Sequence, residues 1–391
     1  MPDLTFLYTE IGRGHPFYLD GIVTCLENGV SNSFTTEITD VYQASRLLSR
    51  QAWRTVRWLY RHGSSPGLAS SLYGRLRTDR DYNRPSLALK VLGSSIRRRF
   101  GQAGSALVVA HPMLVAILKD RPRLYYQHGE VVTPREAVVR GAPCVFVPTA
   151  EAAGPFVAAG YAPDRVRITG LCIEPVLAAR ARDAFDRRLN RLGGTTPLTG
   201  AFFSSGAEPA HHVTHLIRAC LSAVRSGGRA FVVARTGGRL HRAVAAATQT
   251  EEVNTVLVTS TETPSSPVGQ VGLALYTSRA DENALVSTLF DHVDYLVAPS
   301  HERTNWALGL GIPMFPVGPP VGPFAPLNLD QILRAGVGRP IDTEAQAGAL
   351  GDMLADFRSD GSLKEMALSG WGRHEIDGFA RIAQYLTADL S

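Results

Sequence analysis

The feature that most constrains the fold of this chain is its first stretch of about twenty residues. Residues 4–9 (Leu-Thr-Phe-Leu-Tyr-Thr) form a short apolar run that predicts a buried strand, and a helical pattern begins near Pro16. The loop between them contains Gly12, Arg13, Gly14 and His15. A strand that leads into a glycine-bracketed loop at a helix N-terminus is typical of α/β proteins, which use it to approach a phosphate or a sugar closely.

His15 is the unusual residue of this loop. A dinucleotide-binding loop has a third glycine, whereas this loop presents an imidazole at the start of the helix. We therefore predict that His15 acts as a general base or binds an acceptor hydroxyl. The alternative is a histidine that caps the helix and has no chemical role.

Strands and helices alternate along most of the chain, which favours doubly wound parallel sheets. The expected strands of the first half are 4–8, 35–39, 106–110, 123–126, 143–147 and 166–169. Those of the second half are 200–203, 230–234, 254–258, 273–276, 295–298 and 313–317.

The chain of 391 residues is too long for one ordinary core. The polar stretch Arg191–Thr199 reads as a linker, so we expect domains at 1–190 and 200–370. A last segment, 371–391, is expected to form a helix that crosses back to the first domain. His211 and His212 fall in an early turn of a helix, and we expect them at the surface.

Positive charge gathers in residues 43–100, an insertion within the first domain. Between Tyr42 and Phe100 there are thirteen Arg or Lys residues against two Asp, in a chain whose net charge is +5. Arg46, Arg50, Arg54, Arg57 and Arg61 recur at helical spacing, and Leu48, Ala52, Val56 and Leu59 mark another face. A basic amphipathic helix with aromatic residues suits an anionic membrane surface. The alternative is a solvated arginine face over an ordinary core helix; nucleic acid is not expected, because no recognition motif accompanies the charge.

Cysteine spacing and hydropathy indicate the compartment. Cys25, Cys144, Cys172 and Cys220 lie far apart without a CxxC spacing, so neither a disulfide framework nor a zinc site is expected. The longest apolar stretch, Ser105–Leu118, is too short to span a bilayer, and no signal peptide is expected. We expect a cytoplasmic protein, peripheral at the inner face of the membrane.

Several motifs resemble the GT-B glycosyltransferases. They are Gly12-Arg13-Gly14-His15, Ala110-His111-Pro112, the run Gly160–Gly170, and Ala307–Pro313. In addition, Trp58–Tyr73 resembles the segment that the lipid glycosyltransferases of this group use near the membrane and the acceptor. The nearest branch contains the MurG-type transferases and the monogalactosyl- and glucosyl-diacylglycerol synthases. The resemblance covers most of the chain and implies two doubly wound Rossmann-like domains facing a cleft.

The resemblance and the chemistry of a diphosphate together predict the site. A diphosphate needs backbone N–H donors and cations. The expected donor-binding residues are Ser204, Ser205, Gly206, Arg235, His301, Glu302, Arg303, Thr304 and Asn328. The expected acceptor-binding residues are Gly12, Arg13, Gly14, His111 and His128, with His15 and Glu130 catalytic. Each of these roles has a structural alternative. His111 and His128 could be strand-end histidines bonded to the backbone, residues 204–206 a plain turn, and Arg235 a solvated side chain.

The chain also departs from the family pattern. Trp306 stands where the family has a ribose-binding glutamate, with Glu302 one helical turn earlier, and Ala325 replaces a glutamine. His301-Glu302-Arg303 replaces a Gly-Gly loop, and the usual Thr-Asp-Phe is absent around Gln127–Glu130.

Taken together, these features predict an inverting, metal-independent glycosyltransferase. It would move a sugar from a nucleotide-activated donor to a lipid or small hydrophobic acceptor, with the nucleotide-sugar as co-substrate and no cofactor or metal. The alternatives are a non-catalytic GT-B-like sugar-nucleotide-binding protein and a sugar-nucleotide epimerase, for which we assign no set of acid/base carboxylates.

Overall fold

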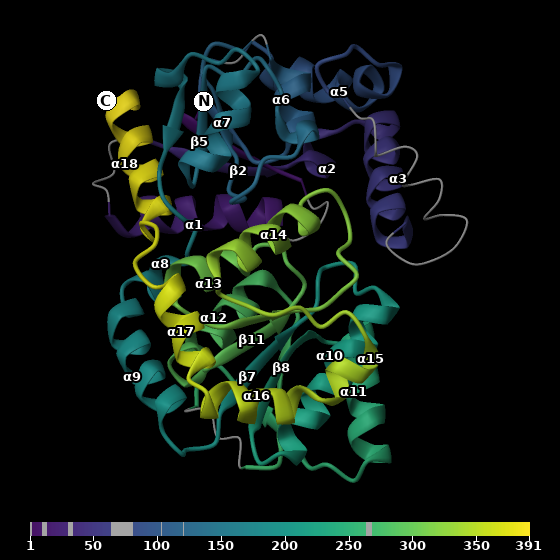
Figure 1. Cartoon of the computed structure of the whole chain (residues 1–391). Helices are drawn as coiled ribbons and strands as arrows, with labels where there is room; N and C mark the ends of the chain where they lie inside the picture. Colours follow the sequence, from purple (N-terminus) through teal and green to yellow (C-terminus); the bar gives the residue numbers. More distant parts are fainter. Residues whose placement is uncertain are drawn as a thin grey trace. The chain divides into compact units, whose positions relative to one another are not determined.

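The structure, a computed structural model, consists of two compact units, each built on a six-stranded parallel sheet (Figure 1). It describes residues 2–9, 14–29, 34–63, 81–102, 104–119, 121–262 and 268–391, with the backbone alone at 14 and 59–63. Unit 1 comprises Met1–Pro175 and Glu375–Ser391, and unit 2 comprises Val176–His374. The predicted α/β class with two Rossmann-like domains is confirmed.

The sheet of unit 1 has the strand order β2-β1-β3-β4-β5-β6. The strands are β1 (Leu4–Tyr8), β2 (Thr36–Asp40), β3 (Ala106–Val109), β4 (Leu124–Gln127), β5 (Cys144–Val147) and β6 (Val166–Ile168). The helices are α1 (Gly14–Gly29), α2 (Val41–Ala44), α3 (Leu47–Gly63), α5 (Leu87–Phe100), α6 (Pro112–Leu118), α7 (Ala150–Ala158) and α18 (Gly378–Leu390), with short 3-10 turns η1 (Arg135–Ala137) and η2 (Pro163–Arg165). Each strand overlaps one that the sequence predicts.

The two faces of this sheet bury different helices, because side chains alternate along a strand. Phe6 and Val108 point into a cluster shared with α1 and α18. Leu7 and Leu107 point into a second cluster shared with α3, α5, α6 and α7. Helices on both faces define a doubly wound unit.

Helix α18, at the end of the chain, lies beside α1, at its beginning (Figure 1). The rings of Phe17 and Phe379 meet edge to face at 5.7 Å. A Cβ on Gly21 would lie 2.2 Å from the Phe379 ring, so this close approach requires glycine.

The sheet of unit 2 has the strand order β12-β11-β7-β8-β10-β9. The strands are β7 (Thr199–Phe203), β8 (Arg229–Arg235), β9 (Thr255–Val258), β10 (Val271–Tyr276), β11 (Tyr295–Ala298) and β12 (Met314–Pro316). The helices are α8 (Pro175–Ala178), α9 (Ala181–Gly193), α10 (Ala210–Arg225), α11 (Arg239–Thr250), α12 (Arg279–Leu289), α13 (Thr304–Leu310), α14 (Ala325–Ala335), α15 (Glu344–Gly348), α16 (Leu350–Ser359) and α17 (Ser362–Gly370), with a 3-10 turn η3 (Phe290–His292). No helix in the described part of the chain is long and apolar enough to cross a bilayer.

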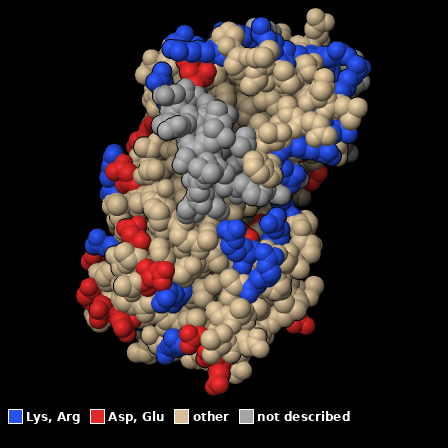
Figure 2. Space-filling model, turned by 90° about the vertical axis from the view of Figure 1, so that its right-hand side faces the viewer, with Lys and Arg blue, Asp and Glu red and all other residues tan. Residues whose placement is uncertain are grey.

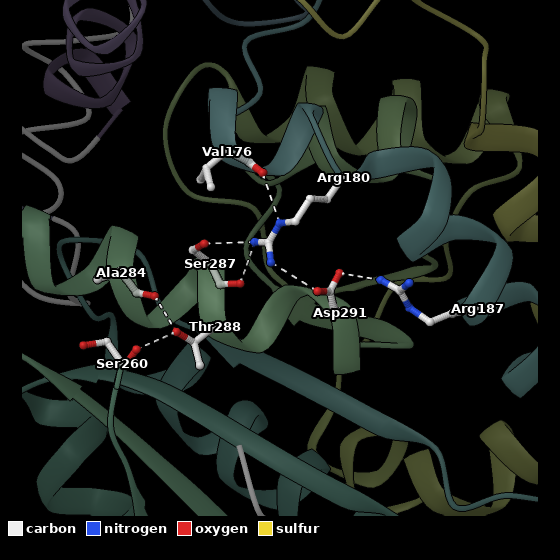
Figure 3. A network of polar contacts seen from close by, with 8 residues as sticks. All are labelled: Val176, Arg180, Arg187, Ser260, Ala284, Ser287, Thr288 and Asp291. Carbon is white, nitrogen blue, oxygen red and sulfur yellow. Dashed lines mark hydrogen bonds and ion pairs between the residues drawn. The ribbon is translucent and has the colours of Figure 1, made fainter. Parts of the chain in front are cut away.

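The boundary between the units lies before α9, not in the stretch 191–199 that the sequence suggested. Arg180 donates to the backbone and side chain of Ser287 and pairs with Asp291, which also pairs with Arg187 (Figure 3). These bonds attach α8 and α9 to α12 and η3. The linker prediction was therefore wrong, because residues more than one hundred positions later hold this segment in unit 2.

An ion pair with a buried carboxylate strengthens the same attachment. Asp294 is fully buried; its Oδ1 accepts from Arg191 Nε at 2.6 Å, and its Oδ2 accepts from the Thr199 backbone N–H at 2.8 Å. Arg188, also fully buried, donates to the carbonyls of Val293 and Leu310, each at 2.9 Å. Burial lowers the pKa of Arg188 to about 9, while the negative charge of Asp294 opposes that shift.

Candidate functional site

Each sheet has a topological switch point, where ligands gather in open parallel sheets. In unit 1 it lies between β1 and β3, because the chain runs from β1 to β2 on one side and then crosses to β3 on the other. In unit 2 it lies between β7 and β11. The predicted residues His15 and His111 follow β1 and β3, and the predicted runs at 204–206 and 301–304 follow β7 and β11.

His15 and His111 lie together at the switch point of unit 1. Their ring centroids are 4.4 Å apart with the planes tilted by 52°. His111 is the N-cap of α6, and its Nδ1 accepts from the Met113 backbone N–H at 3.1 Å. The bond matches the backbone-bonded alternative that the sequence left open, and the acceptor contact predicted for His111 stays a prediction.

The hydrogen bond of His15 defines its tautomer. His15 Nδ1 lies 2.9 Å from the Ala110 carbonyl oxygen, which can only accept. Nδ1 therefore carries a hydrogen, and in the neutral ring Nε2 carries the lone pair. An imidazole oriented in this way presents Nε2 as a proton acceptor, which is the arrangement a general base needs.

His128 has a structural environment. Its side chain is buried, and Nε2 lies 3.0 Å from both the Val132 carbonyl and the Thr133 hydroxyl. Burial among apolar groups lowers the pKa of His128 to about 4, so the ring is neutral near pH 7. His128 holds the loop that carries Glu130, and we assign it a positioning role and no acceptor contact.

The loop after β4 packs closely on α1. A Cβ on Gly129 would lie 2.1 Å from the ring of Tyr18, which is itself buried. Only glycine lets the backbone between His128 and Glu130 pass this ring. Gly12 and Arg13 lie outside the described residues, and Gly14 begins α1.

Glu174 was not identified from the sequence, and its carboxylate also follows a strand of the unit 1 sheet. Glu174 is buried, six per cent exposed, and follows the β6 strand near the end of unit 1. Burial raises the pKa of the Cys172 thiol, and the charges of Glu130 and Glu174 raise it further. Both carboxylates therefore act electrostatically on Cys172, which also accepts a hydrogen bond from Gln127 Nε2 at 3.2 Å. The sequence feature that could have identified Glu174 is its position between Ile173 and Pro175, just after the last strand of the first domain.

The turn after β7 offers polar groups at the switch point of unit 2. Ser204 and Ser205 are half-buried and Gly206 is exposed. The Ser204 hydroxyl oxygen is buried and has no hydrogen-bond partner among the described residues. Arg235 lies exposed at the end of β8, where it remains a candidate for a phosphate contact.

Hydrogen bonds to residues of α14 hold the turn after β11. Ser300 Oγ donates to the Ala325 carbonyl at 2.8 Å, and Asn328 Nδ2 donates to the Ser300 carbonyl at 3.1 Å. Asn328 therefore supports the loop that carries His301 and Glu302. Thr304 is fully buried, and its hydroxyl has no hydrogen-bond partner within the described ranges.

Arg303 and Trp306 belong to the core of unit 2. The Arg303 guanidinium carbon lies 4.1 Å from the Trp306 ring centroid and 4.7 Å from that of Phe203, and an ion pair of 4.0 Å joins Arg303 to the buried Glu282. Arg303 is only two per cent exposed, so its predicted role as a donor ligand is not retained. Trp306 packs edge to face on Phe203 and Phe290. The position where the family pattern has a ribose-binding glutamate therefore lies inside the core of this protein.

The expectation of surface histidines on α10 was wrong for His212. This side chain is one per cent exposed, and its Nε2 donates to the Pro319 carbonyl at 2.8 Å. Helix α10 is covered on one side by the sheet and on another by α15 and α16, so even its first turn has a buried face. Burial lowers the pKa of His212 to about 4, and the neighbouring His211 and His301 lower it further.

The two buried histidines predict a loss of stability in mild acid. Their ordinary pKa is 6.5 and their folded pKa is about 4, so between these values the unfolded chain binds protons that the folded chain does not. The free energy of unfolding should fall by about 3 kcal/mol per histidine as pH drops from about 6.5 to about 4, and no further below that. Urea denaturation of the parent, His128→Asn and His212→Asn across this range measures the effect. Identical pH slopes for a variant and the parent would contradict the assignment for that histidine.

Comparisons with known proteins identify the fold. No family model matches this chain. No curated protein matches it. Among solved structures, it is similar to UDP-GlcNAc 2-epimerase from Neisseria meningitidis bound to UDP-GlcNAc, with 12% identity over 98% of this chain and 99% of that chain and a TM-score of 0.59.

Two further solved structures give the same result. The S. aureus MnaA-UDP co-structure is 12% identical over 99% of this chain and 97% of that chain, with a TM-score of 0.55. MurG from Acinetobacter baumannii is 10% identical over 98% of this chain and 99% of that chain, with a TM-score of 0.55. The chain therefore has the GT-B fold.

Proposed function

We propose that this protein is a glycosyltransferase that uses a nucleotide-sugar donor and inverts the anomeric carbon. The observation that carries the proposal is His15, held by the Ala110 carbonyl so that Nε2 is the proton acceptor at the switch point of unit 1. The expected acceptor is a lipid or a small hydrophobic molecule that carries a hydroxyl group.

The donor side of the proposal rests on unit 2 and on the ligands of proteins with this fold. Two of the similar structures are described as bound to UDP-GlcNAc or UDP. In this chain the hydroxyls of Ser204 and Ser205 and the guanidinium of Arg235 stand at the ends of β7 and β8, where a diphosphate finds hydrogen-bond donors. We expect the nucleotide-sugar as a co-substrate, with neither metal nor cofactor.

The reaction would proceed in one displacement. The acceptor hydroxyl gives its proton to His15 Nε2 as its oxygen attacks the anomeric carbon. The bond between that carbon and the diphosphate oxygen breaks, and the nucleoside diphosphate leaves with both electrons. Glu130, half-buried on the loop after β4, would orient the acceptor or the imidazole.

A sugar-nucleotide epimerase is the second candidate, and one observation favours it. The charges of Glu130 and Glu174 both raise the pKa of the Cys172 thiol, so these two glutamates are candidates for the pair of carboxylates that the sequence did not assign. Proton removal and return at a sugar carbon requires such acid and base groups. Release of free nucleotide, or formation of an epimer, without any acceptor would support this candidate over the transferase.

Nucleotide binding is the first expectation to test. A ligand that binds only the folded state raises the melting temperature, and at about 100 times its Kd it adds about 2.7 kcal/mol of stability. We expect a rise of about 5 °C with UDP or UDP-GlcNAc in a thermal-shift panel that also contains GDP, ADP, dTDP and CDP.

A pair of variants makes this experiment specific. Ser205→Asp places a negative charge at the proposed diphosphate site and should abolish the shift. Ser359→Asp adds the same charge at an exposed position of α16 and should preserve it. No shift with any nucleotide or nucleotide-sugar, for folded parent protein, would refute the donor site.

A further inference from the structure

Unit 1 carries an open groove between the start of α3 and the end of α5. Its volume is about 730 Å³, and its lining includes Arg46, Arg50, Ser94 and Arg98. All of these residues belong to unit 1, so the groove is complete within one unit. It lies away from His15 in the fold, because it is formed by helices packed on the other face of the sheet from α1.

The groove is basic. Figure 2 looks onto the side of the molecule that carries α3, and blue Lys and Arg atoms follow the upper part of this face. Arg46 and Arg98 are exposed, and within the described residues neither has a carboxylate at ion-pair distance. Two neighbours are already engaged, since Arg99 pairs with Glu37 at 3.1 Å and Arg97 donates to the Ile117 carbonyl at 2.7 Å.

Hydrogen bonds hold the backbone at Arg46 and the side chain of Arg50. Arg46 is fixed through its backbone N–H, which donates to Ser95 Oγ at 3.0 Å, and Arg50 Nε donates to the Tyr42 carbonyl at 2.8 Å. Ser49 Oγ donates to the Leu92 carbonyl at 2.6 Å and so joins α3 to α5. The positive groups therefore lie on a packed helical surface with a defined shape.

Two leucines project from the same edge. Leu47 is 76% exposed and Leu48 is 83% exposed, and both line the groove. The sequence pattern placed Leu48 with Ala52 and Val56 on one face of the helix. Ala52 and Val56 do pack against the core beside the buried Ser49 and Trp53, whereas Leu48 is exposed. Two largely exposed adjacent leucines beside three arginines are an unfavourable arrangement in water alone, and they match the interface of a bilayer.

We propose that this face is a docking site for an anionic lipid bilayer. The phosphodiester headgroup of an anionic lipid occupies the groove between Arg46, Arg50 and Arg98, and the side chains of Leu47 and Leu48 enter the boundary with the acyl chains. Charge complementarity selects this occupant, because guanidinium groups bind phosphate oxygens and basic segments are attracted to anionic leaflets. The inference does not depend on the sugar chemistry proposed above.

Vesicle flotation with the full chain tests the site. The parent protein should float with vesicles of phosphatidylcholine and phosphatidylglycerol at a ratio of about 2:1 and not with phosphatidylcholine alone, and about 0.5 M salt should release it. Each arginine near the surface contributes a factor of about 5, so Arg46→Gln with Arg98→Gln should weaken binding by about 25-fold. Leu47→Ser with Leu48→Ser should weaken it by at least about 10-fold.

Matched controls separate the groove from general attraction to a basic protein. Arg339→Gln with Arg373→Gln removes the same charge from exposed positions of unit 2, and Leu257→Ser with Leu368→Ser removes exposed leucines there. These variants should bind as the parent does, and all variants should keep the parent melting temperature.

Two results would overturn the proposal: no flotation of the parent with anionic vesicles at low salt, or equal losses in groove and control variants. A parent that responds to UDP without binding vesicles would refute only the docking site. A parent that binds vesicles through the groove without responding to any nucleotide would refute only the proposed function.

Discussion

Replacement of His15 by alanine should lower the rate of sugar transfer by about 10² to 10⁴-fold, the usual contribution of a general base. The loss should appear in kcat, because the acceptor hydroxyl then has no positioned group to take its proton. Nucleotide binding should be unchanged, since the proposed donor residues belong to unit 2. The assay measures UDP release from UDP-GlcNAc in the presence of a membrane lipid extract as the source of acceptor.

Two further variants serve as controls for the His15→Ala result. His15→Asn keeps a side-chain donor for the Ala110 carbonyl and removes the base, so it should lose as much rate as the alanine variant. His292→Ala removes an exposed histidine of unit 2 outside the proposed site and should retain full activity. Full activity of His15→Asn would show that His15 only positions the loop, and loss of the UDP thermal shift in His15→Ala would show an indirect structural effect.

Replacement of Asp294 by alanine should lower the free energy of unfolding of unit 2 by about 3–5 kcal/mol. The variant leaves Arg191 without the carboxylate that accepts from its Nε at 2.6 Å, and it leaves the Thr199 N–H without its acceptor. The fully buried Arg188 loses its strongest favourable charge as well. An unpaired charge in the interior costs far more than the lost bond itself.

Urea denaturation followed by the fluorescence of Trp306 and Trp371, both in unit 2, measures this loss. Asp186→Ala is the matched control. Asp186 pairs with Arg182 four residues away on the surface, with both side chains more than half exposed, and its removal should cost less than about 0.5 kcal/mol. A loss below about 1 kcal/mol for Asp294→Ala would mean that water reaches the remaining arginines.

The strands were predictable because their signal is local. An apolar run closed by a turn residue identifies β7 and β11 as well as β1, and side-chain alternation within each strand is a property of a few residues. The candidate site was predictable in outline for the same reason. Loops at the carboxyl ends of parallel strands collect at one edge, so His15 and His111 follow adjacent strands although 96 positions separate them.

The failures concern contacts between distant segments. The predicted linker at 191–199 belongs to unit 2 because Arg180 and Arg187, just before it, both pair with Asp291 more than one hundred positions later. Arg303 is predicted from the sequence to bind the donor, whereas in the structure Glu282, Phe203 and Trp306 enclose it. Burial of a polar group depends on partners that no local pattern contains.

The amino-acid sequence by itself determined the α/β class, the two sheets and the loops that carry the candidate site, because hydrophobic periodicity and glycine placement act over a few residues. The tertiary structure alone decided the unit boundary, the tautomer of His15, the enclosure of Arg303 and the exposure of Leu47 and Leu48. Each of these depends on which surfaces meet, and long-range packing brings those surfaces together.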